Sequence, residues 1–279
     1  MRIDLHTHTT SSDGVLTPTE LAELASQRGV DVLAVTDHDT VTGVGEAFAA
    51  GERLGVRIVA GIELSARHSD RAVHILGYFL DAADGALLRR LDDMQADRLE
   101  RLQRMVRRLN DLGFELTTDD VLAQAKGAVV ARPHVARALV ARGSIASVRD
   151  AFTPELIADG GRADVPRRQL SPHEAVALIG SARGVAVVAH PGLSHHLGTH
   201  EPIPDSLLRD LRDNGLAGLE VDHPDHSPLV REGLRKLAAD LGLITTGGSD
   251  FHGETGRPIA DCTTAEEMFV RLEALAART

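Results

Sequence analysis

The chain has 279 residues, of which 43% are hydrophobic and 25% are charged, and this composition is typical of a globular protein with a sizeable core. Its formal net charge of −11 argues against a long polyanion bound over the whole surface, although it leaves room for a local phosphate site. The single cysteine, Cys262, excludes a disulfide framework and a cysteine-based metal site, and it indicates a cytoplasmic location. We expect no membrane segment, because no apolar run reaches about 18 residues, and no signal peptide, because Met1 leads into a strand-like segment without an apolar h-region.

Seven short segments rich in Val, Ile, Leu and Ala are predicted as buried strands. Helical patterns separate most of them. The first, TPTELAELASQRG, has Thr17 as N-cap, Pro18 at the first helical position and Glu20 completing a capping box. Alternation of strands and helices predicts a parallel α/β sheet that forms a barrel or nearly does so. In chain order the predicted strands are residues 1–5, 31–36, 57–64, 72–79, 184–189, 216–221 and 241–247.

Residues 81–168 interrupt this alternation. They contain a long amphipathic, charge-rich run, LLRRLDDMQADRLERLQRMVRRLNDLG, and then shorter helical patterns without a convincing strand. The segment holds 15 of the 30 lysines and arginines, which solvated charge pairs on helices would explain by themselves. We therefore predict a barrel formed by residues 1–80 and 169–279, with an all-helical insertion domain, 81–168, after the fourth strand.

Histidines and carboxylates occur at the predicted strand ends throughout the chain. In a parallel α/β barrel the carboxyl ends of the strands meet at one rim, where the loops build the active site. The H-x-H spacing of the first strand allows both rings to face the same side, because side chains two apart in extended backbone do so. Imidazole and carboxylate groups without thiolates suit Zn, Fe or Mn, so we predict a metal cluster at this rim. The candidates are His6, His8, Asp13, Asp37, His38, Asp39, Glu63, His74, His190, Asp222, His223, Asp225, His226, Asp250 and His252.

Several motifs at these positions resemble those of a known family. They are DLHTHTTSSDG, VTDHDT, GIELS, VHILGY, VVAHPG and GSDFHG, and they span residues 4–253. The chain resembles the polymerase and histidinol phosphatase (PHP) superfamily, in particular small stand-alone bacterial members with a helical insertion after the fourth strand. The resemblance implies a distorted seven-stranded β/α barrel that binds two to three divalent metal ions, with Mn favoured over Fe or Zn, and that hydrolyses phosphoesters.

The resemblance also implies which residues bind the ions. A water between two such ions would lose a proton near neutral pH, so we expect attack of a metal hydroxide on phosphorus, in line with the leaving oxygen. The implied ligand sets are His6, His8, Glu63 and Asp250 for one ion; Glu63, His74 and His190 for a second; and Asp13, His38 and His252 for a third.

Substrate contacts are implied in three places. The stretch ARPHVARAL resembles an insertion motif that meets the substrate in such relatives, which indicates Arg132 and His134, although an ordinary helix start explains both equally well on local grounds. In the loop DHPDHS the resemblance favours His226 over His223 as a phosphate contact or proton donor. The relatives often have an arginine soon after AHPG. This chain lacks it, and His195 is the candidate replacement, unless it is only a histidine of a surface loop.

We therefore predict a metal-dependent phosphoesterase that acts on 3′,5′-bisphosphate nucleosides, on short 5′-phosphorylated RNA from its 5′ end as an exoribonuclease, or on both. One alternative is histidinol phosphate or another small phosphomonoester, for which a basic, substrate-covering insertion would be unnecessary. Another is a non-catalytic metal-binding module, against which the complete ligand set stands. The expected partners are a small nucleotide or short single-stranded RNA, without stable duplex nucleic acid and without a membrane. The sequence does not determine the oligomeric state.

Overall fold

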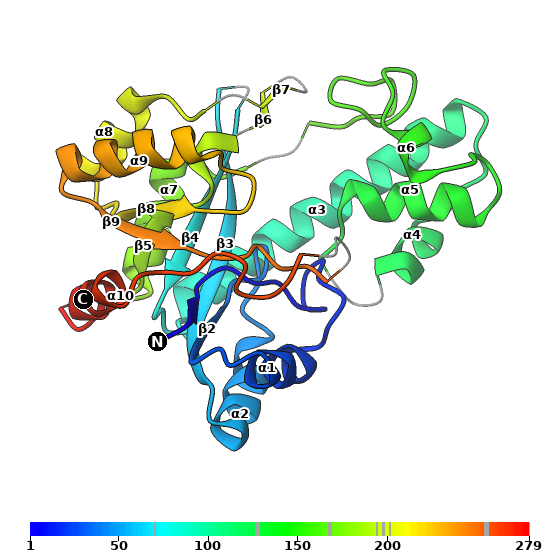
Figure 1. Ribbon diagram of the computed structural model, residues 1–279. Coiled ribbons are helices and arrows are strands. Elements are labelled where there is room, and N and C mark those ends of the chain that lie inside the picture. Colours follow the sequence, from blue (N-terminus) through cyan, green and yellow to red (C-terminus); the bar gives the residue numbers. More distant parts are fainter. Residues whose placement is uncertain are drawn as a thin grey trace. The chain divides into compact units, whose positions relative to one another are not determined.

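The computed structural model describes residues 1–69, 71–125, 129–166, 169–193, 195–196, 199–200, 202–253 and 257–278 (Figure 1). It divides into two compact units, one formed by Met1–Arg89 with Leu170–Thr279 and the other by Arg90–Gln169. We call them the barrel unit and the helical unit. In the described part of the chain, no helix is long and apolar enough to cross a membrane.

One sheet forms the centre of the barrel unit, with its main strands in the order β1-β2-β3-β4-β5-β8-β9. The sheet nearly closes on itself: the Leu5 amide donates to the Gly247 carbonyl at 3.4 Å, and Thr7 forms a parallel bridge with Phe251. The predicted distorted seven-stranded barrel is thereby confirmed. The main strands are β1 (Ile3–Asp4), β2 (Val32–Val35), β3 (Arg57–His68), β4 (Arg71–Tyr78), β5 (Val185–Val188), β8 (Gly218–Asp222) and β9 (Ile244–Gly247).

The prediction of an entirely parallel sheet is wrong at the fourth strand. β4 runs antiparallel to both β3 and β5, whereas the other neighbouring pairs are parallel. β3 and β4 form a hairpin in which Ser65 stands opposite His74 and His68 opposite Arg71. Because β4 is reversed, its early residues, and not its end, lie at the rim where the parallel strands end. The hairpin also extends β3 to His68, beyond the predicted end at residue 64.

Two further strands of two residues each, β6 (His195–His196) and β7 (Thr199–His200), were not predicted. They pair with each other, and β6 pairs with the beginning of β4. They follow a short 3-10 helix, η1 (Pro191–Leu193), which begins within the AHPG motif, residues 189–192. The loop that departs from the family pattern therefore continues the sheet at β4.

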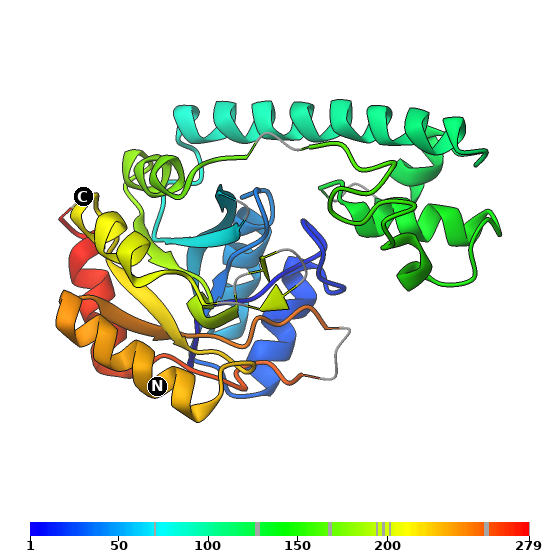
Figure 2. The same ribbon diagram turned by 90° about the horizontal axis from the view of Figure 1, so that it is seen from above.

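Helices cover the outside of this sheet (Figure 2). α1 and α2 pack together, α7 contacts β3, β4 and β5, and α9 and α10 contact β9. The capping box predicted at Thr17 is present: its hydroxyl accepts from the Glu20 amide, and the Glu20 carboxylate accepts from the Thr17 amide. The helices of the barrel unit are α1 (Pro18–Gln27), α2 (Val44–Leu54), α7 (Pro172–Ser181), α8 (Asp205–Asp213), α9 (Pro228–Leu241) and α10 (Glu266–Ala276).

The core of the barrel unit is apolar and nearly free of solvent. Its side chains come from strands far apart in the sequence and from α10, and they hold the strand ends in fixed positions relative to one another. Where β1 and β9 end, Gly248 permits a close approach, because a Cβ atom there would lie 2.4 Å from the Cβ of His6. Members of this core include Ile3, Leu5, Val32, Val59, Leu76, Tyr78, Val187, Ile244 and Phe269.

The helical unit has an apolar core of its own. It contains no strand among its described residues, 90–125, 129–166 and 169, so the predicted all-helical insertion after the fourth strand is confirmed. Leu102, Met105, Leu109, Val135 and Leu139 are among the buried side chains that pack in it. The helices after β4 are α3 (Gly85–Asp111), α4 (Thr118–Ala125), α5 (Arg132–Ala141) and α6 (Val148–Ala151).

Candidate metal centre

The nine side chains predicted as metal ligands lie in one continuous network at the rim of the barrel unit. They come from the segments that follow β1, β2, β5 and β9, from within β3, and from the early part of the reversed strand β4. Three groups within the network have ligand atoms that all lie within 4.8 Å of one another. These groups are His8, Asp13, His38 and His252; His6, His8 and Asp250; and His38, Glu63 and His74.

The carboxylate of Glu63 is the centre of the network, and its side chain is fully buried. Its Oε2 atom lies 3.3 Å from Nε2 of both His6 and His8, and 3.0 Å from Nδ1 of His38. A parallel bridge between His38 and Glu63 fixes the backbone of these two residues next to each other. One carboxylate oxygen therefore faces three imidazole nitrogens.

The other oxygen of Glu63 faces two more histidines. Its Oε1 atom lies 2.8 Å from Nδ1 of His74 and 3.2 Å from Nε2 of His190. His74 can reach it only because β4 is reversed, which places the early part of that strand beside the carboxyl half of β3. Glu63 thus lies within hydrogen-bond distance of ring nitrogens on both of its sides.

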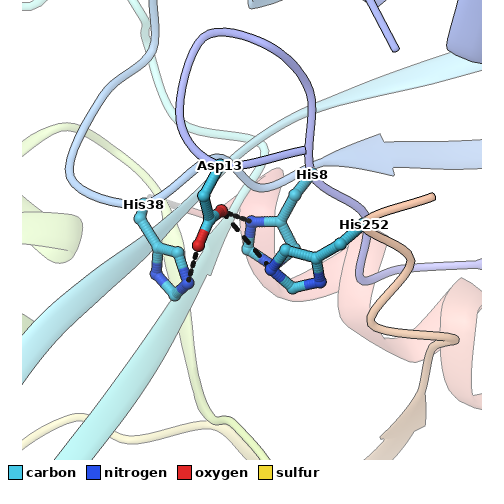
Figure 3. Close-up of side chains that lie close together, drawn as sticks. All are labelled: His8, Asp13, His38 and His252. Atoms are coloured by element: carbon cyan, nitrogen blue, oxygen red, sulfur yellow. Dashed lines mark ion pairs between the residues drawn. The ribbon is translucent and has the colours of Figure 1, made fainter. Parts of the chain in front are cut away.

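Asp250 and Asp13 extend the network on the side of the last strand. The Oδ1 atom of Asp250 lies 3.4 Å from Nε2 of His6 and 3.2 Å from Nε2 of His8. Figure 3 shows His8, His38 and His252 directed toward the carboxylate of Asp13, at N–O distances of 3.8, 3.8 and 3.4 Å. His8 therefore has one ring nitrogen toward Asp250 and the other toward Asp13.

Buried polar atoms at the centre fit a metal ion better than they fit one another. In the described part of the chain, Nε2 of His6, both ring nitrogens of His8, Nδ1 of His38 and Oε2 of Glu63 are buried and have no hydrogen-bond partner. Unpaired buried polar atoms are costly and rare in folded proteins. Divalent ions with a preference for nitrogen and oxygen ligands would satisfy all of these atoms at once.

Burial and neighbouring charges shift the pKa values of the ionisable side chains in the centre. Burial acts to raise the pKa of Glu63, but the neighbouring rings of His38, His74 and His6 outweigh it and hold that pKa well below its ordinary value. Burial lowers the pKa of His38 to about 4 in spite of the nearby carboxylates. Burial also opposes the charged form of His252, yet its hydrogen bond and attraction to Asp13 raise its pKa to about 9. Without metal, the carboxylate of Glu63 is ionised and His252 carries a proton.

Backbone strain accompanies the strand ends. Asp39, His190 and Asp250 have φ angles of 52°, 28° and 50°, a left-handed region that residues other than glycine seldom adopt. Such residues cost free energy and persist where the surrounding structure fixes them, commonly at functional sites. Asp39 follows the rim residue His38, and His190 and Asp250 lie two and three residues beyond the ends of β5 and β9, so these three strained residues all lie at the candidate centre.

Two buried aspartates brace the loops that carry the ligands. Asp37 accepts hydrogen bonds from the amide and hydroxyl of Thr9, both at 2.7 Å, and from the hydroxyl of Ser12 at 2.6 Å. It thereby fixes the loop that presents Asp13. Asp4 accepts from the amide and hydroxyl of Ser249, next to Asp250, at 2.9 and 2.6 Å.

A cavity of about 650 Å³ opens beside the network, and its size suits a nucleotide-sized ligand. Four of the predicted histidine ligands and two of the carboxylates line it. Since these side chains reach its wall, a ligand in the cavity would meet the candidate metal centre directly. The lining residues are His38, Glu63, His74, His190, Leu193, His223, Asp225, Asp250 and His252.

The two histidines of the DHPDHS loop are held in opposite ways. His226 is buried: its Nδ1 lies 2.9 Å from the Val221 carbonyl, and its Nε2 accepts from the Gly192 amide at 3.2 Å. These bonds fix a neutral ring that braces the loop. In His223, Nδ1 accepts from the Asp225 amide at 3.2 Å, so the proton is on Nε2, which lies 3.3 Å from Oδ2 of Asp250. His223, rather than the predicted His226, lines the cavity.

The two candidates of the insertion belong to the helical unit. Arg132 begins α5 and its Nη1 pairs with the carboxylate of Asp159 at 2.6 Å. Nδ1 of His134 accepts from the Ala131 amide at 2.9 Å, so this ring closes the first turn of the helix. Within the same unit, Arg98 and Arg101 line a small pocket together with Arg132. The remaining candidate, His195, lies in β6, and its side chain is outside the described part of the structure.

One buried acidic residue was missed by the sequence analysis. Glu220 lies inside β8, its side chain is fully buried, and Oε1 lies 2.9 Å from Nδ1 of His6. A glutamate within the apolar segment LAGLEV was a usable signal, because a charged residue is almost never fully buried without a partner.

Sequence comparison shows that the chain is similar to phosphoesterases. The family profile described as "PHP domain" matches residues 4–132. The chain is 36% identical to the phosphoribosyl 1,2-cyclic phosphate 1,2-diphosphodiesterase of Eggerthella lenta, over 91% of this chain and 95% of the relative. It is 36% identical to the 3′,5′-nucleoside bisphosphate phosphatase of Chromobacterium violaceum, over 92% and 90% of the two chains. It is 33% identical to a 5′-3′ exoribonuclease of Haemophilus influenzae, over 91% of each.

A solved structure shares the fold along almost the whole chain. It is a protein of Bifidobacterium adolescentis described as a candidate metal-dependent phosphoesterase. The TM-score is 0.87 at 36% sequence identity, and the match covers 98% of this chain and 96% of the other. The similarity therefore includes both the barrel unit and the helical insertion.

The metal-free protein should lose stability as pH rises from about 6.5 to 9. The pKa of His252 is about 9 in the folded state and 6.5 in its ordinary state, so its stabilising contribution is complete below pH 6.5 and disappears as pH rises through 9. Urea unfolding of chelator-treated protein at several pH values in this interval measures how steeply the free energy of unfolding falls with pH. In the His252→Gln variant this fall should be smaller. An equally steep fall in the variant would show that His252 is not its cause.

Proposed function

This chain belongs to the PHP family of metal-dependent phosphoesterases, and from that premise we propose that it hydrolyses phosphate esters of nucleotides at the rim of the barrel unit. The observation that carries the proposal is the set of buried imidazole and carboxylate atoms around Glu63 that lack hydrogen-bond partners in the described part of the chain. They line or adjoin a cavity of about 650 Å³, which is large enough for a nucleotide.

We assign the nine rim residues to three ions in the sets that the resemblance implies, and we propose Mn, with Fe or Zn as substitutes. When bound, such ions would polarise phosphoryl oxygens and lower the pKa of a water. The side chains of the protein hold the ions and orient the substrate. Glu63 faces ligands of all three sets through its two oxygens. His223 lines the cavity, and its Nε2–H group points to Oδ2 of Asp250 at 3.3 Å. When Asp250 binds an ion instead, this N–H group can donate a hydrogen bond to a phosphoryl oxygen of the substrate.

The nucleotide class is favoured by two observations. Two of the similar proteins are named for nucleoside bisphosphates and for RNA, although a third is named for a cyclic phosphate of a phosphoribosyl compound. In the helical unit, Arg98, Arg101 and Arg132 lie around one small pocket, and because Arg132 is paired with Asp159, a phosphate would take the place of this carboxylate on its guanidinium group. We propose that Arg132 binds a phosphate of the substrate that is not being cleaved, and that His134 fixes the helix start that presents it. An insertion used in this way serves as a substrate lid.

The proposal is tested by phosphate release from four compounds under identical conditions with Mn-loaded protein. They are adenosine 3′,5′-bisphosphate, a 5′-phosphorylated RNA trimer, phosphoribosyl 1,2-cyclic phosphate and histidinol phosphate. We expect the highest kcat/KM with one of the first two. A preference for the cyclic compound or for histidinol phosphate would overturn the nucleotide assignment and leave the phosphoesterase assignment intact.

The substitutions His8→Ala and Asp250→Ala should each reduce both metal binding and turnover. Loss of a residue that merely supports a ligand typically costs 10- to 100-fold in affinity or activity, so loss of a ligand should cost more than about 100-fold. Both residues lie at the rim rather than in the apolar core, so the variants should remain folded by circular dichroism. His173→Ala, a histidine of α7 paired with Asp210, is the control and should behave like the unchanged protein. Undiminished turnover in either rim variant would refute the ligand assignment.

Arg132→Ala should lower kcat/KM for the nucleotide substrates by about 10- to 100-fold, because a hydrogen bond to a charged group contributes roughly 1.5–3 kcal/mol. Hydrolysis of p-nitrophenyl phosphate, which has no second phosphate, should hardly change. The matched control is Arg142→Ala, which removes a guanidinium paired with Asp120 just after the same helix. Equal losses on both kinds of substrate would show that Arg132 acts in folding.

A further inference from the structure

Glu220 is a buried carboxylate that the nine-residue ligand set does not include. It lies in the middle of β8, and its side chain is fully excluded from solvent. A buried carboxylate is costly unless hydrogen bonds compensate it. Oε1 lies 2.9 Å from Nδ1 of His6, and Oε2 accepts from the backbone amide of His190 at 2.8 Å. Each oxygen of this one side chain is thus bonded to a rim histidine, and the two histidines follow different strands, β1 and β5.

The first of these bonds fixes the ring of His6. With Nδ1 donating to Glu220, Nε2 is the ring nitrogen of His6 that remains to bind an ion. That atom is buried, lacks a hydrogen-bond partner in the described residues, and lies 3.3 Å from Glu63 and 3.4 Å from Asp250. A carboxylate behind a ligating imidazole sets its tautomer and orientation and makes it a stronger donor to a metal.

The second bond acts on the backbone of His190. This residue has a φ of 28°, which a side chain other than that of glycine adopts only under constraint. Its amide is held by Glu220, and its ring nitrogen Nε2 lies 3.2 Å from Oε1 of Glu63. The strained backbone is therefore fixed in the conformation that turns the ring toward the centre.

We propose that Glu220 is a positioning residue that serves two metal sites at once, the site of His6 and the site of His190. The proposal rests on the metal assignment under Proposed function. Because the two oxygens belong to one rigid carboxylate, a displacement at one histidine is transmitted to the other. Removal of the carboxylate should therefore weaken the binding of two ions rather than one.

The test compares Glu220→Gln with Asp222→Asn. Glutamine keeps the shape of the side chain but loses the charge and one of the two acceptors. Asp222 lies on the same strand, and its carboxylate pairs with Arg235 and Arg231 rather than with a rim histidine. Manganese affinity is measured by competition with a chelating indicator, together with the number of ions bound per chain. We expect dissociation constants raised about 10- to 100-fold for two ions in E220Q and unchanged in D222N.

Further readouts separate positioning from a general loss of structure. Metal-free E220Q should match the unchanged protein in circular dichroism, and excess manganese should restore its turnover. The proposal would be overturned if E220Q folds and binds manganese with unchanged affinity, or if the binding of only one ion is weakened. If E220Q does not fold, E220D is tested instead. Aspartate retains the charge but is shorter by one methylene, so its oxygens lie farther from both histidines, and normal manganese affinity of E220D would also overturn the proposal. Failure of the unchanged protein to bind manganese would instead refute the proposed function itself.

Discussion

The carboxylate of Glu63 is the group on which the arrangement of the rim depends. A fully buried carboxylate is costly unless it is compensated, and five imidazole rings surround this one with nitrogens at 2.8 to 3.3 Å. His74 and His190 hydrogen bond to Oε1, whereas Oε2 and the three nitrogens facing it are left for an ion. The five rings belong to β4 and to the segments that follow β1, β2 and β5, so they meet only when the barrel has formed. The centre is therefore a consequence of the whole fold rather than of any local motif.

The reversal of β4 is the feature that completes this environment. In an entirely parallel barrel the carboxyl end of the fourth strand would supply the ligand, as it does in the other strands. Here Ser65 stands opposite His74 in an antiparallel hairpin, so two neighbouring strands approach the centre from opposite directions. The hairpin gives His74 its contact of 2.8 Å with Glu63.

Much of this was predictable from the sequence, because the responsible signals are local. Apolar segments, the capping box at Thr17 and the recurrence of histidine and carboxylate at strand ends can all be read without knowledge of the tertiary structure. The direction of β4 could not be read in this way, since an apolar segment of eight residues has the same pattern in either direction. The different roles of His223 and His226 also could not, because they depend on which backbone groups each ring nitrogen meets.

Net charge was informative about the whole surface but not about the rim. Nine ligands include only three carboxylates, so three divalent ions would leave a local charge of about +3, and the buried carboxylate of Glu220 would reduce it to about +2. Acidic residues elsewhere on a chain of net charge −11 are screened over roughly 8 Å at physiological salt, so they oppose a phosphate at the rim only weakly. An acidic protein can therefore bind a phosphate dianion, provided that the positive charge comes from ions that buried side chains hold in place.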